Sequence, residues 1–245
     1  MAVLVDIRDV SKVYNPGENE VRALDHVSVS IEEGEYVAII GQSGSGKSTL
    51  MNLLGCLDVP TEGEYYLHGN NVMELDDDEL SDIRNQEIGF IFQGFNLIAN
   101  LTALENVELP LIYRGIGKNK RRMLSEAALE KVGLRNRMDH KPSEMSGGQQ
   151  QRVAIARAIA QAPPVILADE PTGNLDSHST WEIMDVLEKL YQEGRTVILI
   201  THNNEIAQRA KRIIKIKDGR IEDDTKDHVM RTVSDDESPK ITKDP

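Results

Sequence analysis

A glycine-rich segment, "GQSGSGKST" at residues 41–49, carries the strongest chemical signal in the sequence. It fits the pattern G-x-x-x-x-G-K-S and lies between the apolar run "YVAII" and a helical pattern that starts at Lys47. In such a loop, backbone N–H groups wrap a phosphate, the lysine reaches the β- and γ-phosphates, and the serine hydroxyl is placed to bind Mg²⁺. A glycine-rich turn without a ligand does not account for the whole string in this setting. The predicted contact residues are Gly41, Ser43, Gly44, Ser45, Gly46, Lys47, Ser48 and Thr49.

Paired carboxylates end another apolar run, "VILADEP" at residues 165–171. A buried parallel strand that ends here places both acids at the carboxyl edge of the sheet, where the phosphate loop also lies. We expect Asp169 to hold a magnesium ion and Glu170 to act as the general base for a water that attacks the γ-phosphate. The alternative, a solvated acidic turn, is disfavoured because the same chain carries a phosphate loop that needs these partners.

His202 closes the run "TVILITH" at residues 196–202, and its strand directs it toward the γ-phosphate at the same edge. A lone histidine usually has no special role, so this prediction depends on its position. Two other residues are weak signals on their own. Gln93 follows a short apolar run, which is ordinary for glutamine, and a tyrosine at a strand end, such as Tyr14, is more often packing than a platform for a base.

A second glycine motif, "MSGGQQQRVAIARA" at residues 145–158, opens an amphipathic helix. The first turn of a helix has unpaired N–H groups and the positive end of the dipole, so a Ser-Gly-Gly run there suits a phosphate. The motif follows "DHKPSE" rather than a buried strand, so it must meet its anion from elsewhere than the sheet edge. A plain helix cap explains Ser146 but does not explain Gly147 and Gly148, because glycine weakens a helix.

The elements that position these residues follow an α/β pattern. Alternation at Val27, Val29 and Ile31 predicts antiparallel strands before the phosphate loop, and a short strand pair is expected near residues 65–67. Residues 75–132 are mostly helical in pattern. The later chain alternates strand, helix and strand, which is typical of a parallel sheet with helices on its faces.

The C-terminal part divides into a hairpin and a tail. "RIIKIKDGRIE" predicts a hairpin whose turn is Asp218-Gly219. From residue 222 to 245 there are eight acidic and four basic residues and no sustained period, so we expect this acidic tail to be disordered. An interaction or regulatory role for the tail is the minority interpretation.

Composition excludes several partners. The 245 residues include 28 Lys and Arg against 41 Asp and Glu, a formal charge of −13, which repels the phosphate backbone of nucleic acid and anionic lipid. The longest apolar runs span four or five residues, far below the roughly 20 that cross a bilayer, so no direct membrane insertion is expected. The first ten residues alternate as in a strand and do not form a signal peptide, and the single cysteine, Cys56, reads as a small buried hydrophobe in a reduced compartment. We therefore expect a cytoplasmic protein.

Taken together, the motifs resemble the ATPase subunit of an ATP-binding-cassette (ABC) transporter over about residues 3–221. The shared elements are the glycine loop, Gln93, "MSGGQ", "VILADEP", "GNLDS" and His202. Within that family, "LMNLLGCLDVPTEGEYYLHG", "DDDEL" and "FQGFNLIANLTALENVELPL" are most similar to the MacB/LolD group. Members of that group power macrolide or peptide export, or lipoprotein release, through a separate permease of the MacB/FtsX type.

The resemblance implies a P-loop ATPase domain at residues 1–221, with an N-terminal antiparallel β-subdomain and a helical subdomain at about 94–160. Two copies would form a homodimer upon ATP binding, head to tail, so that the signature motif of one caps the nucleotide on the loop of the other. The ATPase would then be held on the cytoplasmic face of the membrane by its permease. We expect the permease to dock at residues 95–111. The core of the helical subdomain explains many of these apolar residues equally well. The alternative function is mechanotransmission or antibiotic sensing through an FtsX-like permease.

The resemblance also implies roles for single residues, with ATP and Mg²⁺ as ligands. Tyr14 would stack on adenine, Asp176 would link the two sites, and His202 would sense the γ-phosphate. Magnesium would be held by Ser48, Gln93 and Asp169. The signature residues that would contact nucleotide across the interface are Ser146, Gly147, Gly148 and Gln149. Two residues depart from the commonest family pattern: Met145 stands where Leu is usual, and Asn174 stands where Ala is usual.

Overall fold

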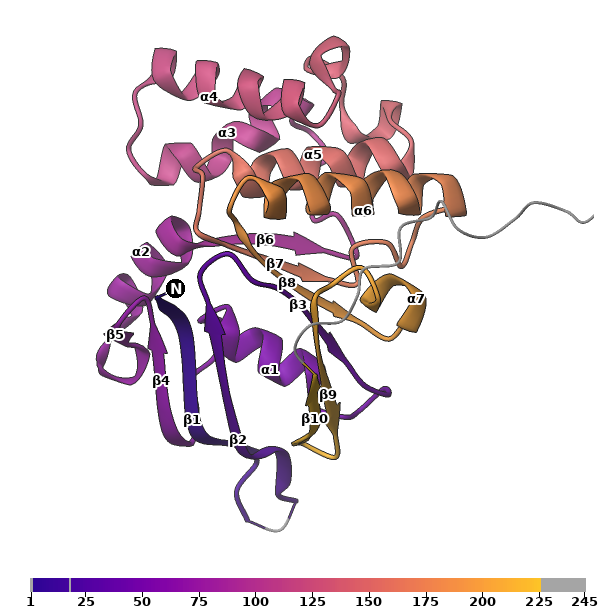
Figure 1. Cartoon of the computed structure of the whole chain (residues 1–245). Helices are drawn as coiled ribbons and strands as arrows, with labels where there is room; N and C mark the ends of the chain where they lie inside the picture. The colour runs from indigo at the N-terminus through magenta and orange to yellow at the C-terminus, as the bar shows by residue number, and fades with distance from the viewer. Residues whose placement is uncertain (1, 18, 226–245) are drawn as a thin grey trace, which may run out of the picture.

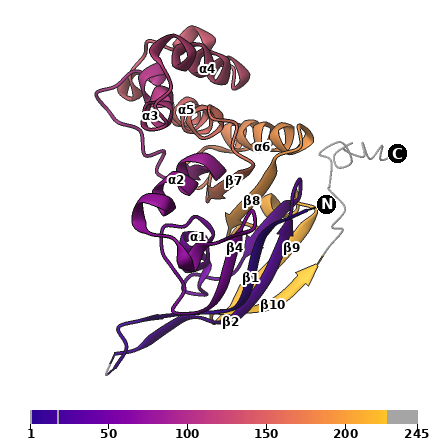
Figure 2. The same ribbon diagram turned by 90° about the vertical axis from the view of Figure 1, so that its left-hand side faces the viewer.

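Two β-sheets organise the computed structural model, which describes residues 2–17 and 19–225 (Figure 1). Within these residues, one sheet has four strands in the order β2-β1-β4-β5, and the other has six in the order β10-β9-β3-β8-β7-β6. The helices α3 and α4 lie at the end of the molecule opposite the hairpin tip of β1 and β2 (Figure 2). The predicted α/β architecture is confirmed.

The four-stranded sheet is antiparallel, as the alternation predicts. Its strands are β1 (Val3–Tyr14), β2 (Val21–Glu32), β4 (Glu62–Leu67) and β5 (Asn70–Asn71). Val5 pairs with Ile31 on one side and with Leu67 on the other, so β1 lies between β2 and β4. The alternating residues Val27, Val29 and Ile31 are buried. The predicted strand pair near residues 65–67 is β4 with β5.

The six-stranded sheet carries the predicted parallel core. Its parallel strands are β3 (Tyr36–Ile40), β6 (Ile88–Phe92), β7 (Val165–Asp169), β8 (Thr196–Thr201) and β9 (Arg212–Lys217). Ile40 pairs with Thr201, and Asp169 pairs with both Ile200 and Phe92. The carboxyl ends of β3, β8, β7 and β6 therefore lie side by side, which brings the segments that follow them to one edge.

Strand β6 was not predicted, because its residues fall inside the stretch of mostly helical pattern. A five-residue strand that is buried on both faces shows no alternation of apolar and polar residues. Periodicity alone therefore does not distinguish it from a short buried segment of helix. In the structure Ile88 and Ile91 are buried, and the strand pairs along its length with β7. This pairing makes β6 the edge strand of the sheet and puts Gln93 at the same edge as Asp169.

Helices cover the sheets and form a separate helical layer. They are α1 (Lys47–Leu54), α2 (Asp77–Glu87), α3 (Ala103–Tyr113), α4 (Lys118–Lys131), α5 (Gly147–Ile159), α6 (Ser177–Gln192) and α7 (Asn204–Ala207), with single 3₁₀ turns at Val72–Glu74, Arg135–Arg137 and Pro142–Glu144. Figure 1 shows α3, α4 and α5 stacked together, with α6 alongside α5. These helices pack on the face of the six-stranded sheet that includes Ile166 and Leu199, and α1 packs on the face that includes Val37 and Ile198. Of the described residues, no helix has both the length and the apolar character to span a bilayer.

Cys56 follows α1 and lies in the core between α1 and the antiparallel sheet. Burial raises the pKa of its thiol to about 11. The thiol is therefore protonated and unreactive at neutral pH, because the thiolate is the nucleophile. Its interpretation as a small buried hydrophobe is confirmed.

The predicted start of the disordered tail at residue 222 is wrong. Strand β10 (Arg220–Thr225) continues past Ile221 and pairs antiparallel with β9. Arg212 is buried and donates from Nε and Nη2 to the two carboxylate oxygens of Asp224, each at 2.7 Å. This charge-assisted pair orders residues that composition alone assigns to a tail. The rest of the predicted tail, 226–245, lies outside the described residues.

Candidate nucleotide site

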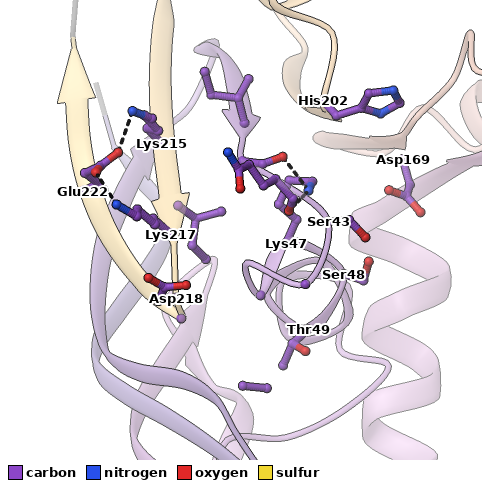
Figure 3. Close-up of a pocket in the computed structure, with 18 of the residues that line it drawn as sticks. Ser43, Lys47, Ser48, Thr49, Asp169, His202, Lys215, Lys217, Asp218 and Glu222 are labelled. Atoms are coloured by element: carbon purple, nitrogen blue, oxygen red, sulfur yellow. Dashed lines mark hydrogen bonds and ion pairs between the residues drawn. The ribbon is translucent and has the colours of Figure 1, made fainter.

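A cleft of about 1180 Å³ lies at the carboxyl edge of the six-stranded sheet. Segments from across the chain converge on it: the glycine loop, Gln93, Asp169, Glu170 and His202. In Figure 3, Asp169 and His202 lie on the same side of the loop as Ser43 and Ser48, and the β9–β10 hairpin lies on the opposite side. The structure thus brings together the residues that the sequence places after separate strands.

The glycine loop is shaped by close backbone contacts. Gly46 has φ 103°, and a Cβ there would come within 2.6 Å of the carbonyl oxygen of Ala23. A Cβ on Gly41 would come within 2.4 Å of the carbonyl oxygen of Ile216. The turn of the hairpin also holds the loop, because the N–H of Gly219 donates to the carbonyl of Ser45 at 2.9 Å. Side chains at these glycines would force the loop away from its place beside β2 and β9.

The start of α1 has the character of an anion site. Among the described residues, no side chain caps the N-terminus of α1 or of α4, whereas the helices α2, α3, α5, α6 and α7 have side-chain caps. Lys47 donates from Nζ to the carbonyls of Gly41 and Gln42, each at 2.7 Å, and stays at the mouth of the loop. The buried hydroxyl of Ser45 has no hydrogen-bond partner in the described part of the chain. Unpaired N–H groups, a lysine and a free hydroxyl at one helix start suit a phosphate chain.

Ser48, Gln93 and Asp169 are among the oxygen-bearing side chains that line the same cleft. Burial raises the pKa of Asp169, and the charge of Glu170 raises it further, while Lys47 opposes the shift. A carboxylate that is penalised in this way is stabilised by a nearby cation. Hydroxyl, amide and carboxylate oxygens are the ligands that Mg²⁺ takes, so these residues fit that ion.

Glu170 is held in a constrained position one residue beyond β7. Its backbone has φ 44°, in the left-handed region that residues other than glycine rarely adopt. Its Oε2 accepts from the Thr201 hydroxyl at 3.0 Å, and its Oε1 accepts from the His202 backbone N–H at 2.8 Å. His202 Nδ1 also lies 2.6 Å from Oε1. Such strained residues cluster at active sites, and here the end of β8 fixes both carboxylate oxygens.

Gln93 and Asn174 form a reciprocal pair. Asn174 donates from Nδ2 to the Gln93 carbonyl at 3.0 Å, and Gln93 donates from Nε2 to Asn174 Oδ1 at 3.4 Å. Gly173 allows this approach, because a Cβ there would lie 2.6 Å from Gln93 Nε2. Asn174 is one of the two residues that depart from the commonest family pattern, and it contacts a predicted magnesium ligand. This contact was not expected from the sequence.

Tyr14 is not among the described residues that line the cleft. It ends β1, pairs with Val21 at the cleft wall, and donates its hydroxyl to Asp58 at 2.9 Å. Lys12 donates to the other oxygen of Asp58 at 2.6 Å. Burial opposes ionisation of Asp58, but the hydrogen bonds from Lys12 and Tyr14 outweigh this effect, so the pKa of Asp58 is lowered. The tyrosine ring is thus anchored at its hydroxyl end.

The signature residues are likewise not among the described residues that line this cleft. The Ser146 hydroxyl accepts from the N–H of Gln149 at 3.3 Å, and Gln149 Oε1 accepts from the N–H of Ser146 at 3.1 Å, which is a capping box. A Cβ on Gly148 would come within 2.7 Å of the Ser179 hydroxyl, whereas Gly147 has room for one. Asp176 caps α6 and accepts from the N–H and the hydroxyl of Ser179.

Two polar residues that contact the site segments, Thr201 and Gln151, were not predicted. The Thr201 hydroxyl donates to Glu170. Asp169 pairs with Ile200, so Glu170 and Thr201, which follow them, lie next to each other. The register of β7 and β8 would therefore indicate this contact. Gln151 is buried two residues beyond the signature residues 146–149, and no sequence signal distinguishes it from the adjacent Gln149 and Gln150, which are only partly buried.

Comparison with known proteins gives the following matches. The ABC transporter family matches residues 24–173. The macrolide export ATP-binding/permease protein MacB of Hyphomonas neptunium is 56% identical over 222 residues, which are 91% of this chain and 34% of the relative. MacB of Mannheimia succiniciproducens is 53% identical over 232 residues, 94% of this chain and 36% of the relative. The chain therefore spans about a third of the length of these relatives.

Solved structures agree with the sequence matches. A dimeric structure of the ATP-binding cassette MJ0796 in a post-hydrolysis state, bound to ADP and Pi, is 50% identical with a TM-score of 0.84. A second dimeric structure of MJ0796, a bacterial ABC transporter cassette, is 51% identical with a TM-score of 0.84. Each match covers 91% of this chain and 98% of the other chain.

Proposed function

Because the chain belongs to the ABC transporter family, we propose that it is the ATP-hydrolysing subunit of a MacB-type transporter and works as a head-to-tail dimer. The resemblance drawn from the motifs is confirmed at the level of the family. The observation that carries the proposal is the separation of two phosphate-binding motifs. The glycine loop lines the cleft, whereas residues 146–149 are not among its described lining residues.

In this proposal the phosphates of ATP lie on the glycine loop at the start of α1. Lys47 then exchanges the carbonyls of Gly41 and Gln42 for the β- and γ-phosphates. Ser48, Gln93 and Asp169 would hold Mg²⁺, which would supply charge neutralisation for the transferred phosphoryl group. The ring of Tyr14, anchored through Asp58, stacks on the adenine.

Glu170 is the proposed general base. It accepts the proton of the attacking water, and its position is fixed by Thr201 and His202. His202, whose side chain is 70% exposed, contacts the γ-phosphate and registers its loss. The signature motif of the second copy supplies Ser146, Gly147, Gly148 and Gln149 to that phosphate, and Asp176 lies at the contact between the two sites.

Mixing two inactive variants tests the shared site. Lys47→Ala disables the loop and Ser146→Arg disables the signature motif, and each variant alone is expected to lack ATPase activity. In a head-to-tail heterodimer, the intact loop of one variant meets the intact signature motif of the other. An equal mixture should therefore regain about a quarter of wild-type activity, because about half the dimers are mixed and each has one intact site. A mixture as inactive as its components would contradict a composite site.

We also propose that a permease of the MacB/FtsX type docks next to this site. A groove of about 620 Å³ is lined by Phe92, Asn96, Tyr113 and Arg157, among others, and so adjoins Gln93. Tyr113 is 83% exposed, which suits a partner surface. Within residues 95–111, Ala103, Leu104, Val107 and Leu111 are buried in the core of the helical layer, so these are unavailable to a partner.

The names of the MacB relatives support this partner, because they join an ATP-binding part to a permease and name macrolide export. We propose efflux of an antibiotic, peptide or lipoprotein, with the ATPase held on the cytoplasmic face of the membrane through the permease. Tyr113→Glu should abolish the stimulation of ATPase activity by the reconstituted permease and leave basal activity unchanged. Stimulation equal to that of wild type would contradict docking in this groove.

A further inference from the structure

Gln151 in α5 is buried completely, with 0% of its surface exposed. Its amide Nε2 donates to the carbonyl of Pro171 at 2.6 Å and to the carbonyl of Phe92 at 3.3 Å. Both partners are acceptors, so only the NH₂ end of the amide can face them, and the orientation of the side chain is fixed. One side chain thus bridges two segments that are far apart in the sequence.

The two carbonyls belong to the segments that carry the chemistry. Phe92 ends β6 and immediately precedes Gln93, while Pro171 immediately follows Glu170. Phe92 and Asp169 are paired across β6 and β7, so the amide lies over the ends of two neighbouring strands. The same helix begins one residue after Ser146. Gln151 therefore connects the signature motif to the proposed magnesium ligand and to the proposed base.

Among the residues that the structure describes, the oxygen of the Gln151 amide makes no comparable contact, so the hydrogen bonds of this side chain come from its Nε2 donor. Gln151 Oε1 is buried and receives no hydrogen bond from any described residue. A buried acceptor without a partner is destabilising, and an apolar side chain of equal length would avoid that penalty. Packing alone would favour methionine at this position. The two bonds from Nε2 are the interactions that an apolar side chain could not make.

A second side chain of α5 holds the same segment further along. Arg157 donates from Nη2 to the carbonyl of Phe95 at 2.9 Å and from Nη1 to the carbonyl of Asn96 at 2.5 Å. Phe95 and Asn96 both have positive φ, at 58° and 49°, so the segment bends sharply where Arg157 holds it. Gln93 thus lies between two anchor points on one helix.

We propose that Gln151 is a positioning residue for the hydrolysis reaction: it fixes Gln93 and Glu170 relative to the signature helix. This proposal rests on the proposed function. When the start of α5 meets the nucleotide of a partner, its movement is transmitted through this amide to the backbone beside the magnesium ligand and the base. Gln151 itself touches neither nucleotide nor metal in this arrangement.

Gln151→Met in the full chain tests the proposal, because methionine matches glutamine in length but donates no hydrogen bond. Relative to wild type, the Mg²⁺ concentration for half-maximal ATPase activity should rise about tenfold and kcat should fall about tenfold, as for other outer-shell groups. The affinity for a non-hydrolysable ATP analogue in EDTA should stay within about twofold, because the glycine loop is untouched. The gain in analogue affinity on adding Mg²⁺ should require about tenfold more Mg²⁺ than in wild type.

Gln150→Met is the matched control. Gln150 lies on the same helix and donates to the carbonyl of Met145, within its own segment. It should keep the magnesium dependence of wild type. Gln151→Asn, which retains the amide but is too short to bridge both carbonyls, serves as a second variant if the methionine variant does not fold, and should show the same magnesium defect.

Two results are decisive. A folded Gln151 variant with the magnesium dependence and kcat of wild type overturns the positioning role. Failure of the positioning role and failure of the proposed function give different results. A wild-type chain without ATPase activity refutes hydrolysis. In that case the effect of Mg²⁺ on analogue binding still tests the role of Gln151.

Discussion

Glu170 Oε1 and His202 Nδ1 lie 2.6 Å apart, and the backbone N–H of His202 reaches the same oxygen at 2.8 Å. An ionised carboxylate only accepts hydrogen bonds, so Nδ1 carries the proton in this contact. The imidazole is then oriented with Nε2 away from the carboxylate. The side chain proposed to respond to the γ-phosphate is thus fixed in orientation by the side chain proposed to take the proton.

Glu170→Gln should lower kcat by about 10² to 10⁴ while leaving ATP binding intact, because the amide cannot accept the proton of the attacking water. Steady-state ATPase assays and titration with an ATP analogue measure the two quantities separately. Glu130→Gln, at an exposed carboxylate that pairs with Arg135 on the helical layer, is the control and should match wild type. Normal turnover by Glu170→Gln would exclude Glu170 as the base.

Lys47→Ala should weaken binding of ATP itself by about tenfold or more, because a charge-assisted contact to the β- and γ-phosphates is lost. Titration with a non-hydrolysable analogue in the presence of Mg²⁺ measures the effect. Lys189→Ala, at an exposed lysine of α6, controls for loss of one positive charge. Equal affinities in the two variants would show that Lys47 stays with Gly41 and Gln42 when nucleotide binds.

Asn174→Ala should impair activity through Gln93. A double-mutant cycle with Gln93→Ala should give a coupling energy of about 0.5 to 1 kcal/mol in kcat/KM, as for residues in direct contact. The two single variants and the double variant are assayed at one fixed concentration of Mg²⁺. Additive effects would mean that the reciprocal pair has no role in catalysis.

Asp224→Ala should lower the free energy of unfolding by about 2 kcal/mol, because the buried Arg212 loses two charge-assisted hydrogen bonds to a partly exposed carboxylate. Denaturant titration measures the change. Asp223→Ala is the neighbouring control: among the described residues, its carboxylate accepts hydrogen bonds from Asp224 N and the Thr225 hydroxyl, and a change below about 0.5 kcal/mol is expected. Equal losses would argue against a specific contribution of the Arg212 pair.

Asp169→Asn should raise the melting temperature of the nucleotide-free protein at pH 7 by about 2 °C. Burial and Glu170 raise the pKa of Asp169 in the folded state, so its ionised form destabilises the fold. That penalty is complete above the folded pKa and disappears as pH falls below the ordinary value of 3.8. The difference between variant and wild type should shrink accordingly in scanning calorimetry, whereas Asp139→Asn, at an exposed acid, should show no such gain at pH 7.

The position of the cleft was predictable from the sequence, because the motifs that line it follow strands and the cleft forms at the strand ends. A parallel sheet brings the segments after β3, β7 and β8 to one edge, so Lys47, Asp169 and His202 could be grouped from their strands alone. The hairpin turn at Asp218 and Gly219 was also predictable, since both residues have the positive φ that such a turn requires.

The contacts between segments were not predictable in this way. The Asn174 pair with Gln93 and the buried bridge of Gln151 depend on side-chain directions that no periodicity encodes. Strand β6 and the end of β10 were missed for a related reason. A short buried run lacks alternation, and the acidic residues of β10 are ordered by one arginine on the neighbouring strand.

The bond from Gly219 N–H to the Ser45 carbonyl has a consequence for synthesis of the protein. The turn that supports the nucleotide loop is made more than 170 residues after the loop itself. A nascent chain that has not reached this turn has the whole motif but lacks one of its supports. We therefore expect the nucleotide loop to be fully supported only after the β9–β10 turn has been made.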